Sequence, residues 1–241
     1  YDQAEPLYLR ALEASERTLG AEHRSTLIAV NNLAGLYQSQ GRYDEAEPLY
    51  LRGLEVRERT LGPEHPSTLI SLSNLAGLYR SQGRYDEAEP LYSRSLETRG
   101  RTLGPEHPST LTSVGNLAGL YDSQGRYDEA EPLYLRSLEA RDRTLGPEHP
   151  STLISVNNLG LLYKSQGHYD EAESLYLRSL EARERTLGAE HPKTLIAINN
   201  LALLYKSQGR YDEAEPLYLR GLEARERTLG AEHPSTLIAV N

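Results

Sequence analysis

The stretch NNLAGLYQSQGRYDEAEPLYLRGLE, residues 31–55, decides the fold because the chain repeats it at a fixed spacing. Near copies begin at four later positions, Ser73, Gly115, Asn157 and Asn199. The Tyr-Asp pair inside each copy returns every 42 residues from Tyr1 to Tyr211, with no insertion or deletion. A fixed period of this length is typical of chains that stack one supersecondary unit on the next.

Each repeat carries two apolar faces with helical spacing. In residues 67–82 the apolar side chains recur three and four residues apart, and Gly83 follows them. A second face covers residues 85–103, where Asp86 and Glu89 have the spacing of a capping box. The same pattern predicts helices at 25–40, 43–61, 67–82, 85–103, 109–124, 127–145, 151–166, 169–187, 193–208 and 211–229.

A single helical hairpin of this kind cannot bury its apolar face, whereas stacked hairpins can. We therefore expect Tyr127 and Ala130 to be largely buried. The chain has no Met, so we expect a fragment of a longer array. The period divides it into a preceding second helix at 1–24, five complete repeats at 25–66, 67–108, 109–150, 151–192 and 193–234, and the start of a further first helix at 235–241.

Composition argues against several classes of partner. The chain has 26 Lys and Arg against 35 Asp and Glu, a net charge of −9, and no basic run. This pattern is unlike that of proteins that bind nucleic acids or anionic membranes. No apolar stretch approaches the about 18 residues of a spanning helix. There is no Cys, which rules out disulfides and fits a reducing compartment, so we expect a cytoplasmic location.

The segments NLAGLY, GRYDEAEPLY and SLE resemble a tetratricopeptide repeat. The Leu-Ala pair, the Tyr three residues later, and the following Gly, Tyr, Ala, Tyr and small residue stand at the family's spacings. The usual unit has about 34 residues. With 42 residues and the turn LGPEHPST, this version is similar to the repeats of kinesin light chains and of related bacterial and fungal proteins. The resemblance implies an all-α, right-handed superhelical α-solenoid of tandem helix-turn-helix repeats.

Most differences between the copies in the first helix fall on the side opposite its apolar series. In this family the first helix lines a concave groove, so the resemblance implies that partners bind along this side. The candidate peptide-binding residues are the constant Asn32, Asn74, Asn116, Asn158 and Asn200, and the neighbouring Asn31, Asn157, Asn199, Gln38, Arg80, Asp122, Lys164, Lys206, Leu161 and Leu203. An asparagine amide can pair with the backbone of an extended peptide.

Two other interpretations of these residues stay open. The constant asparagines can instead bond between neighbouring helices and hold the stack together. The changes of charge at Gln38, Arg80, Asp122, Lys164 and Lys206 can be drift on a solvated face, since exposed positions diverge first after duplication.

Catalytic and metal-binding patterns are missing from the sequence. It contains no phosphate-binding loop, nucleophile elbow or HExxH helix motif. The recurring Glu-His pair supplies one His per repeat, too widely spaced for shared zinc ligation, so a role in the turn is expected. We expect no catalytic residue, metal site or cofactor, and no enzyme activity.

These features predict a scaffold that binds a protein or an extended peptide in its concave groove. The near-identity of the repeats favours the recognition array of a larger multidomain signalling protein, such as a nucleotide-dependent oligomerising (STAND or NLR-like) ATPase. The alternatives are a kinesin light chain-like cargo adaptor and a spacer without a ligand. Self-association through the open ends of the stack is a further expectation.

Overall fold

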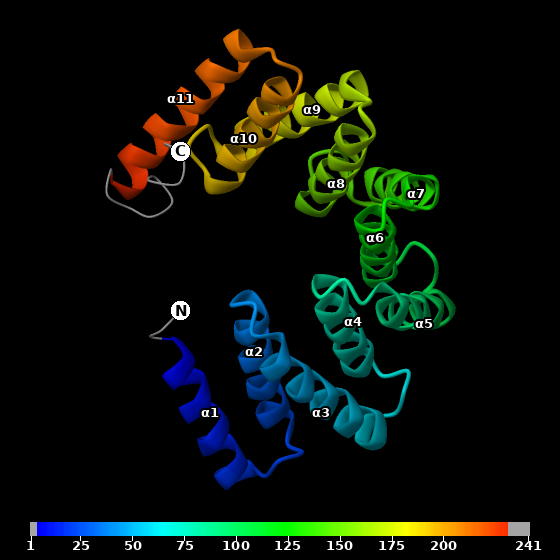
Figure 1. Ribbon diagram of the computed structural model, residues 1–241. Helices are drawn as coiled ribbons and strands as arrows, with labels where there is room; N and C mark the ends of the chain where they lie inside the picture. The colour runs from blue at the N-terminus through cyan, green and yellow to red at the C-terminus, as the bar shows by residue number, and fades with distance from the viewer. Residues whose placement is uncertain (1–3, 231–241) are drawn as a thin grey trace. The chain divides into compact units, whose positions relative to one another are not determined.

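The computed structural model describes residues 4–230, and every regular element within them is an α-helix. The chain divides into two units, residues 1–124 and 125–241. The first holds α1 Ala4–Leu19, α2 Arg24–Ser39, α3 Tyr43–Leu61, α4 Pro66–Ser81, α5 Tyr85–Leu103 and α6 Pro108–Ser123 (Figure 1). The second holds α7 Tyr127–Leu145, α8 Pro150–Gln166, α9 Tyr169–Leu187, α10 Pro192–Ser207 and α11 Tyr211–Leu229.

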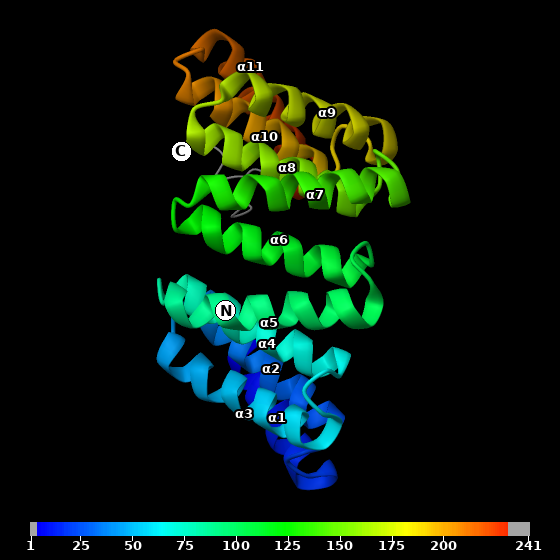
Figure 2. The ribbon, with the colours of Figure 1, turned by 90° about the vertical axis from the view of Figure 1, so that its right-hand side faces the viewer.

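The predicted helices are confirmed. The second helices of the repeats have the bounds that the sequence predicted, and each first helix begins one residue earlier than expected. Within either unit, each helix contacts the helices before and after it in the chain, so the hairpins stack side by side (Figures 1 and 2). No helix within residues 4–230 is both long and apolar enough to cross a membrane. The predicted segment 235–241 lies outside the described residues.

A histidine begins each first helix after α1. In α4, His65 is the N-cap, and its Nδ1 accepts a hydrogen bond of 3.1 Å from the backbone N–H of Ser67. The same contact recurs at four other histidines, His23, His107, His149 and His191. The bond satisfies one of the amide groups that a helix start leaves without a partner. The repeated Glu-His pair therefore has the expected role in the turn.

The predicted capping box at Asp86 and Glu89 is wrong. The helix α5 begins at Tyr85, with Arg84 as an N-cap that makes no side-chain capping bond. Asp86 is thus already inside the first turn, where its charge suits the helix dipole. Glu89 instead accepts a hydrogen bond of 3.0 Å from the hydroxyl of Tyr121.

Alanines allow the helices of each hairpin to approach closely. Ala46, Ala88, Ala130 and Ala172 have no exposed surface. Leucines of the first helices fill the space between neighbouring hairpins, and Leu72 and Leu78 are fully buried. Ala130 is buried as predicted, whereas Tyr127 is only half-buried because it is the first residue of α7 and lies at the helix end.

A tyrosine, a glutamate and an arginine join one repeat to the next. In the C-terminal unit, Glu173 of α9 accepts a hydrogen bond of 2.8 Å from the Tyr205 hydroxyl and one of 2.6 Å from Arg210. The Arg210 guanidinium also lies 4.1 Å from the centre of the Tyr205 ring. The same three residue types meet around Glu5 and Glu47 in the N-terminal unit. We call this arrangement the arginine clamp.

One junction in the C-terminal unit has a weaker version of the clamp. There His168 stands where the other junctions have arginine. Tyr163 still donates a hydrogen bond of 3.1 Å to Glu131, and its ring centre lies 6.0 Å from that of His168. The junction between α7 and the hairpin of α8 and α9 thus keeps the hydrogen bond from tyrosine and has histidine in place of the arginine.

Replacing Ala130 by glutamate should destabilise the chain by about 3 kcal/mol, because a carboxylate would enter a contact with no exposed surface. Thermal and urea unfolding followed by circular dichroism would measure the loss. Arg136→Glu, an exposed change on the same helix, is the control and should cost less than about 0.5 kcal/mol. Equal midpoints for the parent and Ala130→Glu would contradict this packing.

The clamp predicts loss of stability in acid. Hydrogen bonding from Arg210 lowers the pKa of Glu173 against the opposing effect of burial. Because the folded-state pKa lies below the unfolded value, the stabilisation is present above the unfolded pKa and is lost as pH falls through the lowered one. Urea titrations from pH 6 to about pH 3 should show a shallower loss in Glu173→Gln than in the parent. The exposed Glu215→Gln should follow the parent, and identical slopes for all three would refute the assignment.

Candidate functional site

The structure places the predicted groove residues on the first helices α2, α4 and α6 of one unit and α8 and α10 of the other. Asn32, Lys206, Leu161 and Leu203 are exposed. The rest are half-buried: Asn31, Asn74, Asn116, Asn157, Asn158, Asn199, Asn200, Gln38, Arg80, Asp122 and Lys164. A partner approaching this side of the helices would therefore meet amides, charges and two leucines.

Part of the asparagine series bonds within the protein. Asn74 of α4 donates a hydrogen bond of 2.7 Å to Asn31 of α2. Asn200 of α10 donates one to Asn157 of α8 in the same way. At these positions the structure supports the interpretation that asparagines hold neighbouring repeats together. Asn116 and Asn158 make no side-chain hydrogen bond within residues 4–230, so their amides keep their capacity for a ligand.

The varied position after Leu-Tyr also has internal contacts in the N-terminal unit. Gln38 accepts a hydrogen bond of 2.9 Å from the Tyr50 hydroxyl and donates one of 3.2 Å to Ser81. Burial raises the pKa of Asp122, and the charge of Arg80 acts in the opposite direction. In the N-terminal unit these side chains are thus partly buried at the junction between repeats, whereas Lys206 at the same position of α10 is exposed.

The repeat of α8 carries a paired change of sequence and packing. Where Gly35 occupies α2, the hydroxyl of Tyr50 lies 3.6 Å from the place of a Cβ. In α8 the sequence changes to Gly160-Leu161, and the Tyr176 ring fills the space of the missing Gly160 methyl, 2.8 Å from an added Cβ. The Tyr176 hydroxyl is buried and has no hydrogen-bond partner among residues 4–230, and burial raises its pKa. Leu161 is left 41% exposed on the candidate face.

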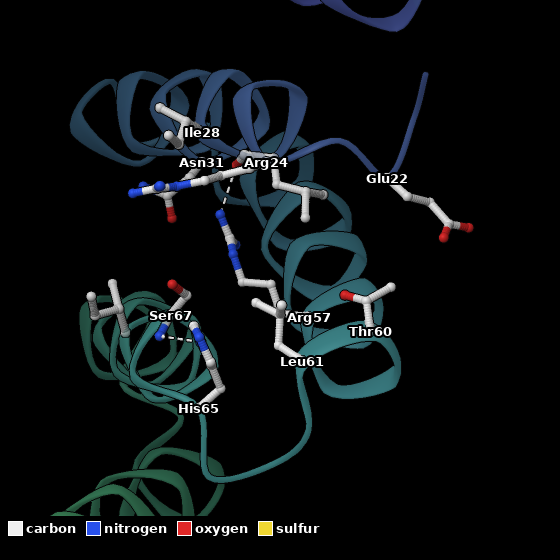
Figure 3. A pocket seen from close by; sticks show the side chains of 11 residues that line it. Glu22, Arg24, Ile28, Asn31, Arg57, Thr60, Leu61, His65 and Ser67 are labelled. Atoms are coloured by element: carbon white, nitrogen blue, oxygen red, sulfur yellow. Dashed lines mark hydrogen bonds between the residues drawn. The ribbon is translucent and has the colours of Figure 1, made fainter. Parts of the chain in front are cut away.

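Each unit has a pocket beside the predicted groove residues of its first helices, and the two pockets occupy equivalent places in the repeat. The N-terminal pocket has a volume of about 620 Å³ and lies between α2, α3 and α4 (Figure 3). The C-terminal pocket has a volume of about 440 Å³, between α8, α9 and α10, and its residues stand three repeats later. The apolar walls are Ile28, Leu61 and Ile70 in the first pocket and Ile154, Leu187 and Ile196 in the second.

A buried arginine lines each pocket. Figure 3 shows Arg57 of α3 reaching between α2 and α4. Its guanidinium donates to the Leu27 carbonyl at 3.0 Å and to the Ser71 hydroxyl at 2.7 Å. Burial lowers its pKa. Arg183 occupies the equivalent place in the second pocket, and burial lowers its pKa as well.

Sequence reasoning placed Asn31 and Asn157 at the site but missed the other pocket residues. Two signals could have found them. Ile28 and its copies Ile70, Ile154 and Ile196 are apolar residues on the otherwise polar side of the first helix. Arg57 stands seven residues after Tyr50, on the apolar side of its helix.

Across the described part of the chain, no three His, Asp or Glu side chains are grouped closely enough to hold a metal ion.

Comparisons with known proteins assign the chain to a family. The model of the tetratricopeptide repeat matches residues 25–99, 70–141, 115–185, 158–227 and 193–240, and a second model of the same repeat matches residues 1–25. The chain belongs to the tetratricopeptide repeat family. A search of the curated proteins finds no match to this sequence.

Solved structures place it in the kinesin light chain-like group. A putative kinesin light chain from Podospora anserina with nearly identical TPR-like repeats is 33% identical, with 86% of this chain and 98% of that chain covered and a TM-score of 0.69. BtubC (BKLC) from P. vanneervenii is 27% identical over 97% and 93% of the two chains, with a TM-score of 0.74. NprR in complex with its cognate peptide NprX shares the fold, at 18% identity, 95% and 64% coverage and a TM-score of 0.67. The family and these neighbours support a protein-interaction scaffold.

The close contact at Gly160 predicts opposite responses to one substitution. Gly160→Ala forces the Tyr176 ring to move, whereas Gly35→Ala meets only an ordinary contact and gains helix propensity. Gly160→Ala should be less stable than Gly35→Ala by about 1–3 kcal/mol in urea unfolding. Equal stability of the two variants would contradict the packing of Tyr176.

Proposed function

We propose that this chain binds an extended segment of a partner protein along the exposed side of its first helices. The observation that carries the proposal is a row of exposed apolar residues on these helices. In the C-terminal unit Ile154 and Ile196 are each 53% exposed, Leu161 is 41% exposed and Leu203 is 38% exposed. Apolar side chains gathered on one face beside polar groups are typical of a protein-binding surface.

Side-chain direction makes these residues continuous along each helix. In α8, Ile154, Leu161 and Lys164 stand seven and three residues apart, so they share one face. In α10, Ile196, Leu203 and Lys206 repeat the spacing. Each helix thus offers apolar surface followed by a cation, which suits a segment with apolar and acidic residues. The amide of Asn158 is available to the segment's backbone.

Two further observations support this function. NprR has the same fold and holds its cognate peptide NprX. In addition, the residues on the predicted groove side of the first helices differ between the repeats, while the buried residues stay nearly constant. A surface that discriminates between different ligand side chains would show this pattern.

The biological setting that we propose is the recognition array of a larger multidomain signalling protein of the STAND or NLR-like type. The near-identity of the repeats favours this setting over a kinesin light chain-like cargo adaptor, and an inert groove would favour a structural spacer. We propose a cytoplasmic protein without catalytic activity, which binds proteins and not nucleic acid, and whose stack can self-associate through its open ends.

A peptide-array screen tests the proposal. The parent should retain segments that combine apolar and acidic residues. Lys164→Glu with Lys206→Glu should change which peptides are retained, because it reverses the charge beside Leu161 and Leu203. Asn158→Ala should weaken binding across peptides, by roughly two- to tenfold for one hydrogen bond. Circular dichroism checks the fold of each variant.

The control is Arg136→Glu, which changes an exposed charge on the second helix α7 and should leave the profile intact. Identical profiles for the parent and the lysine double variant would refute the groove. In that case the spacer interpretation becomes the better one.

A further inference from the structure

We infer that the turn around His168 is a binding site for a guanidinium group, supplied by an arginine side chain of a partner protein. The site is separate from the first-helix face of the proposed function and has the opposite chemistry. That face offers cations to an acidic segment, whereas this turn offers hydrogen-bond acceptors to a cation. The arginine clamps of the other junctions show what these acceptors hold.

The guanidinium of Arg84 has four neighbours in its clamp. It donates hydrogen bonds of 2.6 Å to Glu47, 2.7 Å to Glu87 and 2.9 Å to Oε1 of Gln82. Its central carbon lies 4.1 Å from the centre of the Tyr79 ring. The same four kinds of neighbour surround two other clamp arginines, Arg42 and Arg210. Two carboxylates, an amide oxygen and an aromatic face therefore form a complete guanidinium site in this repeat.

The turn at His168 keeps all four of these neighbours. They stand at the same places in the repeat and are Glu131, Glu171, Gln166 and Tyr163. The backbone is also the same, with φ of −79° at His168 and −81° at Arg84. Both residues donate their backbone N–H to the carbonyl of the tyrosine five positions earlier, at 2.8 Å and 2.9 Å. Only the side chain that carries the guanidinium is different.

The acceptors around His168 have few partners of their own. Oε1 of Gln166 is buried and has no hydrogen-bond partner within residues 4–230. In the same range Glu171 has no hydrogen bond or ion pair, and Glu131 accepts only from the Tyr163 hydroxyl, at 3.1 Å. Burial raises the pKa of Tyr163, and the hydrogen bond to Glu131 and the charges of Glu131 and Glu171 raise it further, so both carboxylates lie near this hydroxyl. A buried amide oxygen and two carboxylates thus retain capacity for a donor.

The imidazole of His168 does not replace the guanidinium. Its ring centre lies 6.0 Å from that of Tyr163, at a tilt of 43°, whereas the guanidinium of Arg84 lies 4.1 Å from its tyrosine ring. The His168 side chain makes no hydrogen bond within the described residues. A neutral imidazole has one N–H to donate, and a guanidinium has five in a planar fork. Residue 168 therefore leaves most of the acceptor capacity to a ligand.

The site opens at the protein surface. His168 and Glu171 are both exposed, so a guanidinium can reach the acceptors while the rest of its molecule stays in solvent. A long arginine side chain on another protein has this form. The net charge of −9 also attracts a partner with a basic surface.

A capped peptide with one arginine between glycines is the probe, and the same peptide with citrulline, a neutral residue of the same shape, is its match. At about pH 8, where imidazole groups are neutral, the arginine peptide should shift the NMR signals of the Tyr163 ring and the Gln166 amide saturably. The citrulline peptide should bind more weakly. Equal dissociation constants for the two peptides would overturn the inference. Binding of methylguanidinium without binding of the arginine peptide would overturn the protein partner.

Variants of the turn separate the site from general attraction of cations. His168→Arg fills the site with the chain's own guanidinium, so it should abolish the response at Tyr163 and raise the midpoint of thermal unfolding. Glu171→Gln should weaken peptide binding by roughly two- to fivefold, the range of an exposed ion pair. Glu215→Gln, an equally exposed change on α11, is the control and should bind as the parent does. Equal responses in the parent and His168→Arg would refute the site.

His168→Ala tests whether the imidazole blocks the acceptors. It removes the ring and should bind the arginine peptide at least as strongly as the parent. A response in His168→Ala with none in the parent would mean that the imidazole closes the site, and the inference would be wrong.

Arg84→His transfers the site to the N-terminal unit. The variant keeps Glu47, Glu87 and Gln82, so the arginine peptide should give a saturable shift at Tyr79 that the parent does not show. The His168 turn shows that the repeat folds with histidine at this place. If circular dichroism confirms the fold and Tyr79 gives no response, the four neighbours are not a guanidinium site and the inference fails.

Discussion

A buried guanidinium that has only neutral partners joins three helices at a time. Arg57 of α3 bonds to a carbonyl of its own helix, to the Leu27 carbonyl of α2 and to the Ser71 hydroxyl of α4. Because the charge has left water, each of these acceptors has to be in place. The contact also explains a small residue at position 53, where a Cβ would lie 3.2 Å from Nη1 of Arg57. Arg57 therefore holds α2, α3 and α4 together, lines the N-terminal pocket and limits position 53 to a small residue.

Much of the fold could be predicted because short local sequence patterns determine where its helices begin and end. The 42-residue period, the helical spacing of leucines and the glycines after them located the helices α2 to α11 to within a residue or so, whereas the first helix, expected within residues 1–24, covers Ala4–Leu19. Gly83 shows why: its φ of 74° lies in the left-handed region that favours glycine, so the helix ends there. The N-cap residues of the first helices were harder to predict from the sequence. Histidine is not among the preferred N-cap residues, yet His65 caps α4 through Nδ1, which accepts only when that nitrogen carries no proton.

The candidate site was predicted less completely because its chemistry depends on pairs of residues. Sequence comparison found the varied side of the first helices, but it could not show that Asn74 and Asn200 are bonded to other asparagines. The pockets need residues from three helices, and no local pattern brings those together. The histidine at position 168 is visible in the sequence, but its meaning depends on the acceptors that the fold gathers around it.

Many contacts that cross from one repeat to the next recur at the same sequence separations. Among these separations are 32, 37 and 43 residues, as between Tyr37 and Glu5, Arg42 and Glu5, and Asn74 and Asn31. Each repeat thus carries one half of the junction before it and one half of the junction after it. A gene that gains or loses one whole 42-residue segment would restore every such junction, because the new neighbours bring matching halves. Recombination can therefore change the length of the array, and with it the number of junctions between repeats, in whole steps.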